Sequence, residues 1–120
     1  MRVDFKDDRK NITVIGLDQW DYGQKLEIYG IPDVTHAEVH FCCESDTEAL
    51  IKQAQVTDHI TADIPDKLLR TGENLKAYVY IATATEGKTI RTITMIVNRR
   101  QRPEDYTALP EKNLLREILE

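Results

Sequence analysis

Residues 75–97 read LKAYVYIATATEGKTIRTITMIV, and this stretch is the clearest indication of the fold class. Two runs rich in β-branched and aromatic residues, 75–82 and 89–97, flank a polar segment at 84–88 that contains a glycine. These residue types favour extended strands, and glycine favours a tight turn between them. The stretch therefore predicts an antiparallel β-hairpin.

Shorter strands are predicted upstream of the hairpin. Apolar and polar side chains alternate in 25–30 and 36–43, as expected for strands with one face in a core. In the second of these runs, Ala37, Val39, Phe41 and Cys43 are the predicted core positions. Residues 49–56 fit a strand or a helix, and the β-like stretch after them favours a strand. Further strands are expected at 11–15 and 59–65, with one helical turn at 65–70 joining two sheets.

Many short strands without a full helix between them indicate two packed antiparallel sheets. We expect an all-β fold, an immunoglobulin-like antiparallel β-sandwich over residues 11–100 followed by a short C-terminal helix. Residues 1–10 form a charged leader before it, and 101–109 form a linker after it. Residues 110–120 start with a proline and predict the beginning of an amphipathic helix.

The predicted helix has a single apolar stripe. Its members lie at helical spacing: Leu114, Leu115, Ile118 and Leu119. An isolated helix shorter than about 12–15 residues is marginal in water, so this one needs a partner. Either it folds back onto its own sandwich, or it begins a coiled coil or bundle that joins copies of the chain. In the second case the four residues are the predicted oligomer contact.

Composition disfavours several classes of protein. The net charge of −5 and the isoelectric point near 5.2 argue against nucleic-acid binding, and the one basic cluster is Arg99, Arg100 and Arg102. Mean hydropathy is −0.47 and no apolar run approaches the roughly 20 residues of a membrane span. Adjacent Cys42 and Cys43 project to opposite faces of a strand, which argues against a disulfide framework. Cytosolic synthesis is expected.

Catalytic and metal chemistry have little support in the sequence. His36, Glu38, His40 and Cys42 share one strand face, but successive side chains there are about 6.5–7 Å apart, too far for one tetrahedral ion. Other strands would have to contribute, and the remaining histidine is His59. A G-x-S-x-G elbow and phosphate-binding glycine loops are absent from the sequence. We expect no enzyme activity, no catalytic residue, no metal and no cofactor.

One aromatic pair stands out in the first loop. Trp20 and Tyr22 could stack on a sugar or contact a partner protein, or Trp20 could plug one end of the sandwich. Burial of the only tryptophan is the commoner outcome, since large aromatic side chains are mostly buried. The two residues remain the candidate partner or glycan contact.

Four segments together resemble a known family: 15–30 (IGLDQWDYGQKLEIYG), 38–41 (EVHF), 64–69 (IPDKLL) and 99–106 (RRQRPEDY). They are similar to the N-terminal module of tail or baseplate proteins encoded by phages and prophages of Gram-positive bacteria. The turn at 64–69 also resembles one in the N-terminal domain of the phage baseplate upper protein.

The resemblance implies a non-enzymatic structural module with an immunoglobulin-like fold. It implies docking on other tail or baseplate proteins, homo-oligomer assembly through the C-terminal helix, and synthesis in the bacterial cytoplasm before incorporation into the virion. No nucleic-acid or membrane partner is expected. The alternative function is a carbohydrate- or receptor-binding β-sandwich module.

Overall fold

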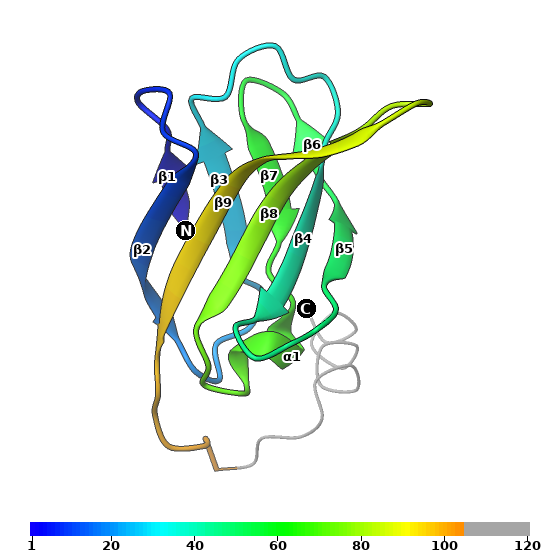
Figure 1. The fold of residues 1–120 in the computed structure, drawn as a ribbon. Helices are drawn as coiled ribbons and strands as arrows, with labels where there is room; N and C mark the ends of the chain where they lie inside the picture. Colours follow the sequence, from blue (N-terminus) through cyan, green and yellow to red (C-terminus); the bar gives the residue numbers. More distant parts are fainter. Residues whose placement is uncertain (105–120) are drawn as a thin grey trace, which may run out of the picture.

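The computed structural model describes residues 1–104, which form two β-sheets in two layers with one short helix at one end (Figure 1). The larger sheet has the order β2-β9-β8-β4-β5 and the smaller sheet the order β1-β3-β7-β6. The all-β class predicted from the sequence is confirmed. The elements are β1 (Arg2–Asp4), β2 (Asn11–Asp18), β3 (Lys25–Tyr29), β4 (Glu38–Cys43), β5 (Leu50–Gln53), β6 (Gln55–Val56), β7 (Ile60–Asp63), α1 (Asp66–Leu69), β8 (Leu75–Ala82) and β9 (Gly87–Asn98).

The predicted hairpin is the centre of the larger sheet. Strands β8 and β9 pair antiparallel from Leu75 opposite Met95 to Ala82 opposite Gly87, with a register shift at Val79/Tyr80. Strand β4 then pairs antiparallel with β8, and β5 with β4. The hairpin prediction is therefore confirmed. It extends well beyond the body of the molecule at its turn (Figure 1).

Two strand pairs are parallel, which corrects the expectation of purely antiparallel sheets. Strand β2 runs parallel to β9, with Asn11 opposite Thr92, and β1 runs parallel to β3, with Val3 opposite Ile28. Alternation reports which face of a strand is buried and carries no information on the direction of its neighbour. Strand β2 also continues past residue 15, where the expected first strand ends, through a bulge between Val14 and Leu17.

The first ten residues, expected as a charged leader, contribute a strand and two core residues. Val3 and Phe5 are 1% and 3% exposed, and the terminal ammonium group donates a hydrogen bond to the Lys25 carbonyl. Gly30 permits this packing, because it has φ +85° and a Cβ there would overlap the Phe5 carbonyl. The many charged neighbours of Val3 and Phe5 conceal their alternation in the sequence.

The ambiguous segment 49–56 belongs to both sheets. Strand β5 completes the larger sheet and β6 completes the smaller one, so the chain crosses between layers at Ala54. The Ala54 amide donates a hydrogen bond to the Ala37 carbonyl, which fixes the crossing. The strand prediction is confirmed here, as two strands instead of one.

The core lies between the layers. The predicted core face of β4 is confirmed, since Val39 and Phe41 are fully buried. Cys42, expected on the wet face, is also buried. Helix α1 links the two sheets as predicted, and its Leu68 and Leu69 close one end of the core. Each fully buried valine, leucine or phenylalanine side chain contributes roughly 1.5–3 kcal/mol to stability.

Candidate functional site

The loop after β2 contacts the segment by which the chain leaves the larger sheet. Trp20 is partly buried, and its indole nitrogen donates a hydrogen bond to the Arg100 carbonyl at 3.1 Å. The guanidinium carbon of Arg102 lies 5.8 Å from the centre of the Trp20 ring, within the range of a cation–π interaction. Trp20 has φ +77°, a conformation that bulky residues rarely adopt. The contacts on the departing chain compensate for this strain.

Gln19 joins three segments at the same place. Its side-chain nitrogen donates to the Arg70 carbonyl at 2.8 Å, and its side-chain oxygen accepts from the Arg100 amide at 3.1 Å. Its own amide donates to the Asn98 carbonyl at 2.8 Å. Gln19 therefore links the end of β2, the end of α1 and the residues after β9.

Gly72 and Arg99 complete this arrangement. The Arg99 side chain donates to the Gly72 carbonyl at 3.1 Å. Gly72 is buried with φ +74°, and a Cβ at this position would approach the Gln19 amide group to 3.0 Å. We call the set Gln19, Trp20, Arg70, Gly72 and residues 98–102 the exit clasp.

Tyr22, the second candidate contact, lies in the same loop and is also partly buried. The Asp66 carboxylate accepts a hydrogen bond from the Gly23 amide at 2.9 Å, and the Tyr22 carbonyl accepts one from the Gln24 side chain. The loop is thus tied to α1, beside the exit clasp. The predicted oligomer contacts Leu114, Leu115, Ile118 and Leu119 lie outside the described residues.

A stack of side chains on the smaller sheet was not anticipated. The Arg2 guanidinium lies 3.9 Å from the Tyr29 ring centre, and the Tyr29 and His59 rings are parallel with centroids 4.4 Å apart. His59 is 2.7 Å from the Asp58 carboxylate and 3.8 Å from that of Glu27. The sequence has no local pattern that predicts β1, and without β1 nothing indicates that Arg2 lies on this face.

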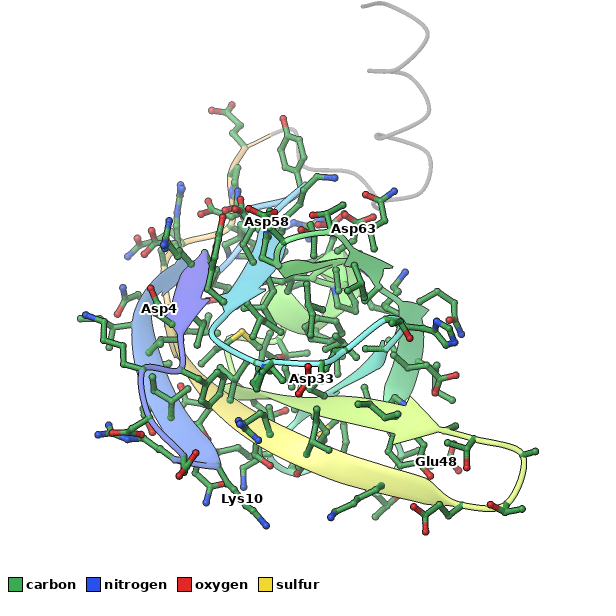
Figure 2. The ribbon with its side chains drawn as sticks, turned by 90° about the horizontal axis from the view of Figure 1, so that it is seen from above. Asp4, Lys10, Asp33, Glu48, Asp58 and Asp63 are labelled. Carbon is green, nitrogen blue, oxygen red and sulfur yellow. The ribbon has the colours of Figure 1, made fainter. Side chains whose placement is uncertain are left out.

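The stack is electrostatically coupled to its carboxylates. The hydrogen bond with His59 lowers the pKa of Asp58, and desolvation followed by the Glu27 charge raises the pKa of the Tyr29 phenol. Asp58 and Asp63 lie on the side of the smaller sheet that faces away from the larger one (Figure 2). This surface is polar and well paired, with Lys25 and Asp63 forming an ion pair at 3.3 Å.

The strand face considered for a metal holds a hydrogen-bonded network. The His40 ring is 2.9 Å from the Glu38 carboxylate and stacks on Tyr80 with centroids 4.6 Å apart. Gln53 donates to the second Glu38 oxygen at 3.2 Å. The bonds from His40 and Gln53 lower the pKa of Glu38. Within residues 1–104, no group of three or more histidine, cysteine or acidic side chains is gathered as a metal site would require.

The two cysteines are buried thiols in a setting that disfavours a nucleophile. Burial is the main cause that raises the pKa of both Cys42 and Cys43. A raised pKa keeps sulfur in its less reactive protonated form. Cys43 is also 3.4 Å from the Thr71 hydroxyl, which holds it in the core.

Comparison with known proteins finds no matching family model, and none of the curated proteins is significantly similar to the chain. No helix within residues 1–104 is long and apolar enough to cross a membrane. The geometry at the exit clasp is therefore the main structural guide to function.

Proposed function

We propose that the chain is a non-enzymatic structural module of a phage or prophage tail or baseplate. In this proposal the two-sheet body is an immunoglobulin-like sandwich that docks on other tail proteins. A C-terminal helix that begins near residue 110 joins copies of the chain. The protein is made in the bacterial cytoplasm and incorporated into the virion.

The exit clasp is the observation that carries the proposal. Gln19 and Trp20 hold the backbone of Asn98 and Arg100 through hydrogen bonds of 2.8–3.1 Å. The Arg99 side chain donates a further bond of 3.1 Å to the Gly72 carbonyl. A body that grips its own departing chain sets the direction of whatever follows, which is useful in a scaffold. The resemblance of segments 15–30 and 99–106 to phage modules supports this role, because those two segments contact each other in the clasp.

Immunogold electron microscopy tests the proposal directly. Phage particles would be induced and purified from the bacterium that encodes the chain, and labelled with an antibody raised against this protein. Gold at one end of the tail is the expected result. An antibody preadsorbed with the purified protein serves as the control. Gold that stays with soluble protein and leaves every particle unlabelled would refute the tail assignment.

A carbohydrate- or receptor-binding module is the second candidate function. Partial exposure of Trp20 and Tyr22 favours it, because an aromatic face that water reaches can stack on a sugar ring. Glycan-array binding that is lost in Trp20→Ala and retained in Tyr78→Ala would favour this function. Each variant needs a circular-dichroism spectrum like that of the wild type. An array without any specific signal would remove the candidate.

A further inference from the structure

A groove of about 330 Å³ lies between β5, an edge strand of the larger sheet, and α1. Ile51 on its wall is 59% exposed, and Ile15 is the other large apolar residue of the described part with such exposure. Seven residues line the groove: Leu50, Ile51, Lys52, Pro65, Asp66, Lys67 and Arg70. Within the described residues, Ile51 is therefore left uncovered at the groove.

The edge of β5 beside the groove has backbone groups that do not face β4. Along antiparallel strands, hydrogen-bonded residue pairs alternate with pairs that are not hydrogen-bonded. Ala54 and Ala37 are a hydrogen-bonded pair, so Lys52, two residues earlier on β5, forms the next such pair with Val39, and Ile51 beside it belongs to a pair that is not hydrogen-bonded. The amide and carbonyl of Ile51 consequently point outward. Proteins commonly protect such an edge by covering it with a helix or a loop.

The groove carries positive charge in an acidic protein. Lys52, Lys67 and Arg70 line it, and among the ion pairs of residues 1–104 none involves these three side chains. The single carboxylate in the lining, Asp66, accepts the Gly23 amide. An apolar segment flanked by acidic side chains is the complementary ligand.

The chain leaves the larger sheet at the end of β9, and the exit clasp connects it to the α1 side of the groove. One side chain, Gln19, bonds both Arg70 on the groove wall and Arg100 on the departing segment. Ten residues after Arg100, the sequence reaches Pro110 and then a stripe of apolar residues. Its charged neighbours are three acidic residues, Glu111, Glu117 and Glu120, and two basic ones, Lys112 and Arg116, so acidic side chains predominate. A connection this short gives a high effective concentration of the stripe at the groove of the same chain.

We propose that the groove between β5 and α1 is the docking surface for residues 110–120 of the same chain. The stripe Leu114, Leu115, Ile118 and Leu119 packs over the edge of β5 at Ile51, and the acidic residues face the basic rim. The inference rests on the proposed function, in which the C-terminal segment is an assembly element. It adds the surface that binds this segment when the chain is on its own. Copies then associate by exchanging that segment, as in domain swapping.

Hydrogen–deuterium exchange on the full chain tests the proposal. Ile51→Glu places a repulsive charge in the groove, and amides in 110–120 should then exchange roughly tenfold faster or more. Ile15→Glu is the matched control, because Ile15 is also open to solvent but lies on β2 at the opposite edge of the sheet. That variant should exchange like the wild type. Equal exchange of 110–120 in the wild type and Ile51→Glu would overturn the proposal.

A reciprocal variant guards against effects on folding. Leu115→Glu should speed exchange of amides in β5 and α1 and leave the β8–β9 hairpin unchanged. Unchanged exchange in β5 and α1 would count against the groove as the docking surface.

Sedimentation of the wild type separates the two sources of the segment. A monomer with residues 110–120 protected supports binding within one chain. Protection confined to dimers, and absent from the monomer that forms on dilution, would mean that a chain does not hold its own segment and would overturn the assignment. These readouts are independent of the location of the protein on a phage particle.

Discussion

The Arg100 amide donates a hydrogen bond to the side-chain oxygen of Gln19, 81 positions earlier in the chain. The same side chain donates to the Arg70 carbonyl. Gln19→Ala removes both bonds and leaves their backbone partners unsatisfied, so we expect a loss of about 1–3 kcal/mol in the free energy of unfolding. Urea denaturation measures this. Gln101→Ala, at an exposed neighbour, is the control and should change little; equal losses in both variants would contradict the role of Gln19.

Phe5 tests whether the first ten residues belong to the folded body. It is 3% exposed and packs in the common core, so Phe5→Ala should cost about 3–5 kcal/mol. Lys6→Ala alters an exposed neighbour and should be close to neutral. Thermal and urea denaturation of both variants give the comparison. A neutral Phe5→Ala would mean that the N-terminal segment is dispensable.

Two glycines with positive φ separate backbone strain from crowding. Gly23 has φ +68° and open space within 4 Å of where a Cβ would lie, whereas Gly30 has φ +85° and its Cβ would overlap the Phe5 carbonyl. Gly23→Ala should therefore lower the free energy of unfolding only by the strain of a positive φ, about 1–2 kcal/mol. Gly30→Ala should cost clearly more, because β1 must also shift. Similar unfolding midpoints for the two variants would argue against close packing of β1.

Acid should weaken the protein partly through Glu38. The bonds from His40 and Gln53 lower its pKa from the ordinary 4.5. A carboxyl whose folded pKa is depressed contributes stability above the unfolded value, and that contribution disappears as the pH falls through the folded value. The free energy of unfolding, measured by urea denaturation below about pH 4.5, should fall more steeply with decreasing pH for the wild type than for Glu38→Gln. Parallel pH profiles for the two proteins would contradict the prediction.

Much of the larger sheet was predictable because its information is local. Alternation in β4 and the paired runs of β8 and β9 are visible within a few residues, and burial of Val39 and Phe41 follows from period-2 geometry. The parallel neighbours were not predictable, since β2 and β9 are separated by most of the described chain and alternation is blind to direction.

The exit clasp illustrates the same limit for the candidate site. Trp20 is conspicuous by its residue type, yet its partners Arg100 and Arg102 are about 80 positions away. The Arg2, Tyr29 and His59 stack needs three strands in register before its side chains meet. Contacts of this kind depend on the complete topology, which no local pattern contains.

The parallel pairing of β2 with β9 also determines the order of events during protein synthesis. The ribosome makes β2 at residues 11–18 and finishes its partner only at Asn98. The larger sheet cannot close during translation until nearly all of the described chain has emerged, because long-range strand pairing must wait for both partners. The nascent chain therefore keeps β2 without its partner until β9 has emerged, and the residues that complete this pairing lead directly into the exit clasp.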